Sequence, residues 1–422
     1  MYVRLGNVEY DITNFDHPGG SVIKYNAYEE SLVENLDQET IDSTNTFREF
    51  HYRSKLALKY LKTLPRSNVE CYDRDTMMLK DFDRFRISLE ECGFFEPSMF
   101  HMFYRFFEIM LMFYLSYYSL GRGYKFMSWL VASLVSGRCG WLMHEAGHNS
   151  LVNDIGVNKH IQKMLIGFGL WTSGSMWNSM HNKHHASPQK ENYDMDLDTV
   201  PFVAFYKGAV EASRRGYAGY WSSLWFRLQA YTFLPLTSGV FVMLFWVYYL
   251  HPRKMLVDRD YEQMFYVLLG HVGRASMISY VTGWGYIDSY LFLMLQMMGA
   301  GMYLFGNFAL SHTTTPVISC DDMDVNWVEY AFDHTVDIDP EEPLINWFMG
   351  YLNCQVVHHL FPSMPQFRQP EVSRKLIKWA AERGIKYKIV GYWQAVVECF
   401  RNLKDIGKYY SNKKRVRFKW GY

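Results

Sequence analysis

The sequence predicts a mainly α-helical membrane protein with soluble segments at both ends. Five apolar runs lie in the middle of the chain, each close to the ~20 residues that a helix needs to cross a bilayer. Three clusters of histidines follow these runs, whereas residues 1–65 and the last part of the chain are polar. The apolar runs cover residues 102–120, 124–143, 231–250, 263–283 and 288–310.

The polar ends are expected to lie outside the membrane. Residues 1–65 form the first predicted unit, and the charged stretch 66–98, which has helical spacing, is expected to be a linker with an interfacial helix. The start of the chain has no basic segment followed by an apolar one, so we expect internal segments to enter the membrane. Residues 406–422 are predicted to be a basic, solvated tail, with contact to anionic lipid as the alternative.

Composition argues against some classes of protein. The formal net charge of the 422 residues is +0, which gives no general case for binding nucleic acid. The six cysteines show no CxxC spacing and are too sparse for a disulfide framework. Reduced thiols that face the cytosol or the membrane are therefore expected.

The number of membrane crossings must be even if the histidine clusters share one site. The first two clusters follow the second apolar run, and the third cluster follows the last run. Run 263–283 contains His271 and Arg274, and such groups are expensive to bury in lipid. We therefore expect this run to be re-entrant or interfacial, like residues 158–176, which leaves four crossings and places all clusters at one face.

Each histidine cluster has the spacing of one helix face. Imidazoles three or four residues apart on a helix lie on the same side and can bind one metal ion together. A tetrahedral zinc site cannot use all seven clustered imidazoles, so their number favours two metal ions. Imidazole suits iron, copper, nickel and zinc, so ligand type alone does not choose between them. The clusters are His144 and His148; His181, His184 and His185; and Gln355, His358 and His359.

Further polar residues near the clusters are candidates for the same site. His312 follows run 288–310 and is a candidate eighth donor, although a capping or surface role fits the sequence equally well. Asp194, Asp196 and Asp198 follow the second cluster. They are expected either to orient ligating imidazoles or to form a solvated acidic loop.

The first cluster also matches a different motif. His144-Glu145-Ala-Gly-His148 reads as HExxH, the zinc-protease motif in which the glutamate is the general base. An intramembrane zinc metalloprotease is therefore an alternative. It needs one further ligand and leaves most of the other clustered imidazoles without a role.

The order HxxxH, HxxHH, QxxHH resembles the three histidine boxes of membrane fatty-acid desaturases, and glutamine at the start of the third box is typical of the front-end group. Residues 140–145, 181–188 and 355–365 resemble that family too. The resemblance implies a four-transmembrane-helix desaturase fold over residues 99–405, with interfacial helices and a cytosolic histidine-rich cap. It also implies two non-haem iron ions, O2 as co-substrate, and a multi-pass protein of the endoplasmic reticulum with boxes and termini in the cytosol.

The N-terminal segment resembles cytochrome b5. His17-Pro-Gly-Gly20 resembles its first haem-ligand motif, and His51, in the segment 47–54, resembles the second ligand. The resemblance implies a small α+β domain over residues 1–65 that binds haem b through His17 and His51. The segment between these histidines is longer than the family norm, and residues 29–40 are expected to form a loop. The implied partners are NADH-cytochrome b5 reductase and, as an alternative electron donor, free cytochrome b5.

The resemblance also implies the reaction. A front-end desaturase inserts a cis double bond into a polyunsaturated C18–C22 acyl chain, carried on CoA or phospholipid, between an existing double bond and the carboxyl end. Delta-5 or delta-6 insertion is preferred, with delta-4 and delta-8 open, because the shape of the acyl tunnel is not encoded in the ligand motifs. A sphingolipid desaturase with a fused cytochrome b5 and a non-enzymatic haem-binding membrane protein are the remaining alternatives.

Overall fold

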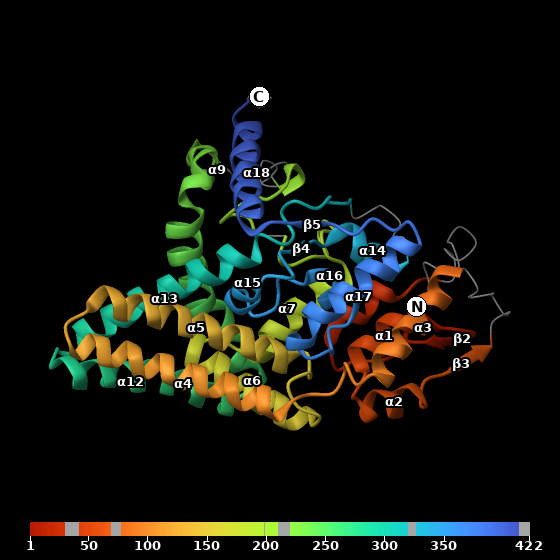
Figure 1. The fold of residues 1–422 in the computed structure, drawn as a ribbon, viewed down its shortest axis with the longest axis horizontal. Coiled ribbons are helices and arrows are strands. Elements are labelled where there is room, and N and C mark those ends of the chain that lie inside the picture. Colours follow the sequence, from red (N-terminus) through yellow and green to blue (C-terminus); the bar gives the residue numbers. More distant parts are fainter. Residues whose placement is uncertain (30–41, 69–76, 198, 210–219, 320–325, 413–422) are drawn as a thin grey trace, which may run out of the picture.

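The computed structural model describes residues 1–29, 42–68, 77–197, 199–209, 220–319 and 326–412. These residues are mainly helical, which confirms the predicted class. Figure 1 shows a bundle of long helices, a cap of shorter helices at one end of it, and an N-terminal unit beside the cap. Most of the expected loop 29–40, Asp198 and residues 413–422 of the predicted tail lie outside the described residues. The prediction of a solvated tail from residue 406 is wrong for residues 406–412, because they continue a helix that ends at Asn412 and Ile406 is buried against Phe226.

The N-terminal unit is a small sheet with helices packed on it. β1 (Tyr2–Leu5), β2 (Val8–Asp11) and β3 (Arg66–Asn68) are antiparallel and lie in that order. Gly6, at φ +60°, allows the tight turn between β1 and β2. Because β3 pairs with β2, the unit extends to residue 68, just past the predicted boundary. Its helices are η1 (Gly20–Asn26), α1 (Thr44–His51) and α2 (Lys55–Leu61).

Helix α3 (Met77–Glu91) joins the N-terminal unit to the cap. Its Arg86 forms a buried ion pair with Glu49 of α1, with Nε and Oε1 2.8 Å apart. On the cap side, Phe82 stacks on Phe361 with 5.6 Å between ring centroids. The sequence predicts an interfacial helix here, but the apolar side of α3 is covered by protein rather than free to meet lipid.

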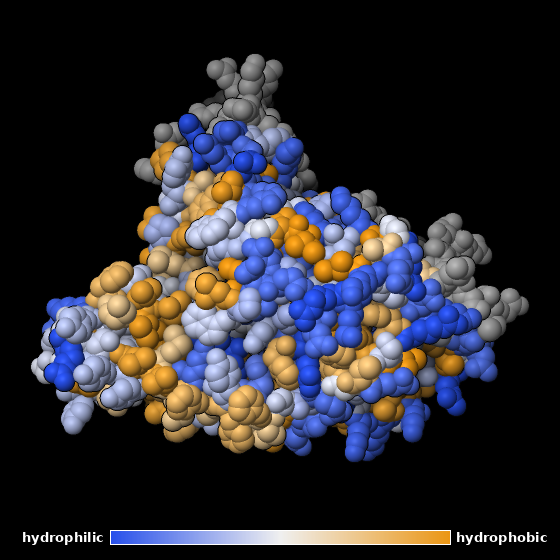
Figure 2. Space-filling model, viewed as in Figure 1, coloured by the Kyte–Doolittle hydropathy of each residue, from blue (hydrophilic) through white to orange (hydrophobic). Residues whose placement is uncertain are grey.

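Four long helices lie side by side in the bundle (Figure 1). Large apolar side chains on their outer faces are exposed, for example Phe100 at 83% and Tyr280 at 86%. Figure 2 shows apolar residues gathered over the bundle and hydrophilic residues over the cap, as is typical of a lipid-facing bundle. The four helices are α4 (Met99–Gly121), α5 (Lys125–Gly147), α12 (Tyr261–Thr282) and α13 (Tyr286–Phe308).

Two helices in the described part of the chain are long and apolar enough to cross a membrane: Leu224–Asp258 and α13. The first is a 35-residue helix that contains the π-helical segments η3 (Phe233–Val242) and η4 (Trp246–Leu250). Pro235 in η3 has no N–H to donate, which accounts for the altered hydrogen bonding there. The α-helical parts are α9 (Tyr220–Thr232), α10 (Met243–Phe245) and α11 (His251–Asp258).

Helix α12 covers run 263–283, for which the sequence predicts a re-entrant or interfacial segment. The chain forms one continuous helix of 22 residues there, which is not a re-entrant turn, and it packs on α4, α13 and the helix α6 (Ile155–Leu170). Such a helix is about 33 Å long, close to the ~30 Å of a bilayer core. Arg274 is 1% exposed and faces the bundle, where its Nη2 donates to Ser136 Oγ at 3.2 Å. A polar residue that faces protein costs far less than one that faces lipid.

The segment after α5 folds back along the bundle. α6 (Ile155–Leu170) packs closely on α5, because Gly169 leaves room for Cys139: a Cβ at Gly169 would lie 2.5 Å from Cys139 Cβ. Trp171, at φ +62°, then ends α6. α7 (Gly174–Ala186) begins at Ser173, whose Oγ accepts the Met176 N–H at 3.3 Å. The predicted interfacial segment 158–176 is therefore two elements joined by a turn.

The cap is tied together by one buried carboxylate. Asp337 accepts the Val356 N–H at 2.9 Å, the Ser373 hydroxyl at 2.7 Å and the Tyr387 hydroxyl at 2.6 Å. It thereby fixes α16, which carries the third histidine cluster, against α17. The cap elements are α14 (Trp327–His334), β4 (Asp337–Ile338), α15 (Pro343–Phe348), α16 (Gln355–Leu360), η5 (Gln366–Arg368), α17 (Gln369–Glu382), β5 (Ile389–Val390) and α18 (Tyr392–Asn412).

Candidate metal centre and haem pocket

Three helices bring the clustered histidines to one place. α5 carries the first cluster at its end, α7 carries the second, and α16 carries the third. The side chains form two groups, within each of which the candidate ligand atoms lie within 4.8 Å of one another. The five-histidine group is His144, His148, His181, His185 and His358, and the three-histidine group is His184, His312 and His359.

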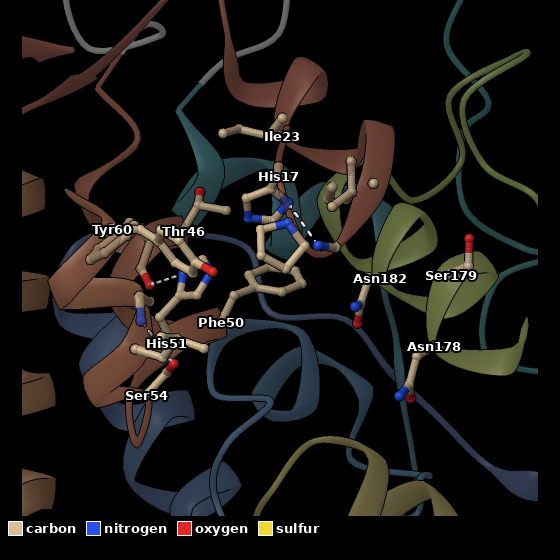
Figure 3. Close-up of a pocket in the computed structure, with 18 of the residues that line it drawn as sticks. His17, Ile23, Thr46, Phe50, His51, Ser54, Tyr60, Asn178, Ser179 and Asn182 are labelled. Carbon is tan, nitrogen blue, oxygen red and sulfur yellow. Dashed lines mark hydrogen bonds between the residues drawn. The ribbon is translucent and has the colours of Figure 1, made fainter. Parts of the chain in front are cut away.

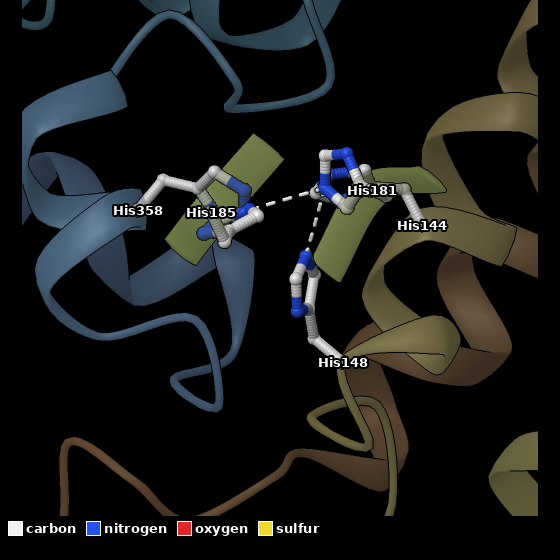
Figure 4. A group of neighbouring side chains, drawn as sticks. All are labelled: His144, His148, His181, His185 and His358. Carbon is white, nitrogen blue, oxygen red and sulfur yellow. Dashed lines mark hydrogen bonds between the residues drawn. The ribbon is translucent and has the colours of Figure 1, made fainter. Parts of the chain in front are cut away.

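The nitrogens of the five-histidine group converge (Figure 4). His181 Nε2 lies 2.9 Å from His144 Nε2, 3.1 Å from His148 Nε2 and 3.1 Å from His185 Nε2. Nitrogens bound to one ion at about 2 Å lie roughly 3 Å apart. One proton cannot satisfy all of these contacts, whereas one cation can accept all the lone pairs.

The three-histidine group lies next to the first. The His184 ring centroid is 4.6 Å from that of His312 and 5.0 Å from that of His359. His359 also stacks on His185 of the five-histidine group, at 4.3 Å. The two groups are thus neighbours, and His312, the candidate eighth donor, belongs to the second.

Buried nitrogens without a partner test whether metal ions fit. Among the described residues, His185 Nδ1, His358 Nε2 and both ring nitrogens of His359 are buried and have no hydrogen-bond partner. Leaving such groups unpaired costs about 1–3 kcal/mol each. A bound cation accepts the lone pair of such a nitrogen, so the all-imidazole set fits two metal ions.

The protonation states agree with metal binding. Burial, and then repulsion from His184, lowers the pKa of His148 and of His312 to about 3. Burial, and then neighbouring imidazoles, also lowers the pKa of four further histidines well below its usual value, namely His181, His185, His358 and His359. These rings are neutral at pH 7, which is the form that binds a metal.

Polar side chains hydrogen-bond to the Nδ1 atoms of several rings and so fix the orientation of these rings. His184 Nδ1 lies 3.0 Å from Asp194 Oδ1. Burial alone would lower the pKa of His184, but Asp194 and Asp196 outweigh it and raise that pKa to about 9. Without a metal ion the His184 ring is therefore protonated on both nitrogens at pH 7. The hydrogen bond from Nδ1 to Asp194 fixes the orientation of the ring, and a metal ion that binds Nε2 must displace the proton there, an arrangement of ligand and carboxylate that is common around metal-binding histidines.

Two glutamines that the sequence did not single out take part as well. The Gln366 amide nitrogen lies 2.7 Å from His144 Nδ1, and the Gln369 amide nitrogen lies 3.5 Å from His358 Nδ1. Both follow the third cluster in η5 and α17, at spacings that match no ligand pattern. Gln355 Nε2 donates to the Leu352 carbonyl at 2.8 Å, and its side chain lies close enough to His312 to oppose slightly the lowering of the pKa of that ring, so it lies beside the three-histidine group.

Glu145 does not act as the zinc-protease alternative requires. Its Oε2 lies 3.4 Å from His101 Nε2, and its Oε1 accepts the Gln366 N–H at 3.1 Å. The carboxylate is therefore engaged with a second layer of residues. The five-histidine group also contains more imidazoles than one zinc-protease site uses.

His17 and His51 face each other across a cavity of about 780 Å³ (Figure 3). Their ring centroids are 6.0 Å apart. An iron held at about 2 Å by one nitrogen of each ring places the centroids close to this distance. His51 Nδ1 lies 2.9 Å from the Phe47 carbonyl, and the Gly19 N–H donates to His17 Nδ1 at 3.1 Å. The contact of His51 puts its proton on Nδ1 and leaves the lone pair of Nε2 for a ligand. His17 Nδ1 accepts a hydrogen bond, so the proton of that ring lies on Nε2, and binding iron through Nε2 requires the ring to give up the contact with Gly19.

Glycine at position 19 is required by the His17 ring. A Cβ on Gly19 would lie 2.8 Å from His17 Cε1, so a side chain would displace the imidazole. Gly20 adopts φ +73°, which other residues adopt only with strain. The two glycines therefore allow the turn that presents His17 to the cavity.

Comparison with known proteins gives one family. Residues 124–391 match the model of the fatty acid desaturase family. The chain is 39% identical over 409 residues to an acyl-lipid (8-3)-desaturase of Rebecca salina, covering 95% of this chain and 90% of the relative. It is 37% identical over 419 residues to an acyl-lipid (8-3)-desaturase of a Thraustochytrium species, covering 96% and 92%. A Delta(6)-fatty-acid desaturase, fat-3, of Caenorhabditis elegans is 22% identical over 433 residues, covering 94% and 93%.

Proposed function

Because this chain belongs to the fatty acid desaturase family, we propose that it is a front-end acyl desaturase. It is an oxidoreductase, and its histidine clusters fit a di-iron site. In the proposed reaction, it inserts a cis double bond into a polyunsaturated C18–C22 acyl chain, between an existing double bond and the carboxyl end. The acyl chain is carried on CoA or phospholipid.

The arrangement of eight imidazoles in two adjacent groups is the observation that supports this proposal. We assign the five-histidine group to one iron and the three-histidine group to the other, with Gln355 beside the second. Two bound iron ions supply the oxidising power to remove hydrogens from an unactivated methylene pair, with O2 as co-substrate.

The protein's own residues position and protect that chemistry. Asp194 and Gln366 hold the His184 and His144 rings in place from behind. His185, His358 and His359 are at most 2% exposed, so water is excluded from most of the donor set. No side-chain base can take a hydrogen from a methylene group, and the residues around the site therefore serve to bind, orient and shield.

Regiospecificity is proposed from the relatives. The two relatives that are more than a third identical over nearly the whole chain carry the (8-3) designation. We read (8-3) as a new bond that lies three carbons from carbon 8 toward the carboxyl end, which is at carbon 5. The name therefore favours delta-5 insertion. The Delta(6) relative is only 22% identical. We therefore favour delta-5 over delta-6 for this chain.

The N-terminal unit is proposed to carry haem b between His17 and His51 and to pass electrons to the di-iron site. The cavity, the ring spacing and the glycine turn support this assignment. NADH-cytochrome b5 reductase is the proposed source of electrons, with free cytochrome b5 as an alternative donor. The domains that follow are a linker helix up to residue 98, the desaturase domain from residue 99, which α18 extends past residue 405 to residue 412, and the basic tail after it.

The protein is proposed to span the endoplasmic reticulum membrane with its boxes and termini in the cytosol. We propose α4, α5, α12 and α13 as the four crossing helices, because they form one bundle and expose apolar side chains. The helix Leu224–Asp258 is also long and apolar enough to cross and packs on α13, but we propose that it does not cross, because a fifth crossing would separate the histidine clusters. In this assignment α12 crosses the membrane in place of run 231–250. The number of crossings therefore stays even, as a shared metal site requires.

Expression in yeast tests the proposed reaction. Cells that lack the activity are fed polyunsaturated acids that differ in the position of their first double bond, and double bonds in the products are then located by mass spectrometry. We expect a new cis bond at carbon 5 in an acid with a bond at carbon 8, and none with His358→Ala and His359→Ala. New bonds only in the long-chain base of sphingolipids would instead support the sphingolipid alternative.

A further inference from the structure

The segment 50–54 connects the haem pocket to the metal centre. His51 faces the haem cavity, and Phe50, the residue before it, lines the same cavity (Figure 3). The Phe50 ring meets the ring of His185 edge-on, with 6.3 Å between centroids and 87° between planes. His185 belongs to the five-histidine group. A single aromatic side chain therefore lies between the two proposed iron sites.

Helix α7 separates the same two sites. Its Ser179, Asn182 and Ala186 line the haem pocket, as Figure 3 shows for the first two. These residues are spaced as one face of a helix, whereas His181, His184 and His185 lie on another face. Because an α-helix is about 10–12 Å across with its side chains, the haem pocket and the metal centre are only about one helix diameter apart.

Contacts on both sides hold the N-terminal unit against this helix. Arg53 donates from Nη1 to the Ser363 carbonyl at 2.8 Å and from Nη2 to the Phe95 carbonyl. Ser363 lies in the loop after the third histidine cluster. On the other side, the Tyr25 hydroxyl donates to the Tyr193 carbonyl at 3.3 Å, and their rings meet at 4.9 Å. The unit is thus docked with its cavity towards α7.

We propose that Phe50 is the electron-transfer contact between the haem and the metal centre. We further propose that Arg53 is the positioning residue that holds the N-terminal unit against the part of the chain that carries the metal centre. This inference rests on the proposed function, which places haem at His17 and His51. Each passage moves one electron, so that ferrous haem iron is oxidised to ferric and one ferric iron of the centre is reduced to ferrous. Phe50 forms no bond and moves no proton, and two passages serve each double bond.

The contact is tested by timing electron transfer without substrate or O2. The full chain, loaded with haem and iron, is kept anaerobic, its haem is reduced by a flash, and the haem absorption is followed as the electron leaves. We expect Phe50→Ala to slow this step at least about tenfold, within the range that misplaced reacting groups cost. Phe50→Trp is expected to restore most of the rate, because it fills the gap with an aromatic ring.

Tyr2→Ala is the matched control, since Tyr2 is an aromatic residue in β1 of the same unit and is not among the residues that line the cavity. It is expected to transfer electrons at the wild-type rate. Haem content, haem reduction potential and iron content are measured for every variant, and the proposal requires them to be unchanged in Phe50→Ala. A wild-type rate in Phe50→Ala, or equal slowing in Tyr2→Ala, would overturn the contact and leave the desaturase proposal standing.

Absence of a haem spectrum in the wild-type chain would overturn the proposed haem site and this inference together. Arg53 has its own readout, which needs neither haem nor iron. Cysteines at positions 25 and 193 are joined by a short bifunctional thiol reagent in membranes. We expect Arg53→Ala to lower the cross-linking yield several-fold and Arg374→Ala, which removes an exposed ion pair with Glu341, to leave it unchanged. Equal yields in the two variants would refute the positioning role.

Discussion

At the scale of single residues, the site depends on the polar side chains that hydrogen-bond to the imidazoles as much as on the imidazoles themselves. The histidines were visible in the sequence because ligand spacing follows the helix repeat. The sequence singled out Asp194 only as one of three aspartates and did not show which of them contacts a ligating histidine. Gln366 and Gln369 carried no signal, because they reach the rings through the fold of the cap and not through a local pattern.

Replacing Asp194 tests this second layer. Asp194→Asn keeps the size of the side chain but removes the charge that holds the proton on His184 Nδ1. We expect iron affinity to fall roughly 10–100-fold, as is usual for such partners. Iron retained after dialysis against a graded chelator measures the effect.

Asp196→Asn provides the comparison for that experiment. Asp196 lies 3.8 Å from the same nitrogen, but its side chain is 49% exposed. We expect it to change iron affinity much less. Equal losses in the two variants would show that general negative charge, and not the hydrogen bond of Asp194, matters.

At the scale of elements, hydropathy alone located most of the bundle, whereas the crossing of run 263–283 stays a prediction. Runs 102–120, 124–143 and 288–310 became α4, α5 and α13. Run 263–283 was judged by His271 and Arg274, yet Arg274 faces protein. A sequence shows that a residue is polar but not which way it points. The close approach of α6 to α5 was equally hidden, since it depends on Gly169 meeting Cys139.

Gly169→Ala is expected to destabilise the bundle. The added Cβ would lie 2.5 Å from Cys139 Cβ, so the two helices must move apart. Overpacking of this kind costs about 1–3 kcal/mol. Thermal unfolding of the purified protein in detergent is expected to show a lower midpoint.

Gly273→Ala in α12 is the matched control. Its added Cβ would meet only Leu269 of the same helix, at 3.4 Å or more. Because alanine favours a helix over glycine, we expect an unchanged or slightly raised midpoint. A drop as large as that of Gly169→Ala would contradict the close packing of α5 and α6.

At the scale of the whole molecule, the proposed order is haem, then α7, then the metal centre, all at one end of a bundle that we propose to span the membrane. The family resemblance provided this order in outline, from motifs spread over the chain. The docking of the N-terminal unit could not be predicted, because it depends on contacts such as Arg53 to Ser363 that are 310 residues apart.

Thiol labelling tests the proposed crossings. In a cysteine-free background, single cysteines replace Asn153, Arg259 and Asp288, and sealed vesicles with the cytosolic face outward are treated with an impermeant reagent. If α4, α5, α12 and α13 cross, Asn153→Cys and Arg259→Cys are labelled at once, and Asp288→Cys only after the vesicles are opened. Protection of Arg259→Cys would show that run 231–250 crosses instead of α12.

Metal content of the active enzyme tests the central claim most directly. The full chain is purified with its desaturase activity intact, haem iron is counted from its absorption spectrum, and total iron and zinc are measured by mass spectrometry. The eight imidazoles in two adjacent groups predict two non-haem irons per chain, lost when His185 and His359 are both changed to alanine. A fully active preparation that holds a single zinc and no non-haem iron would contradict it.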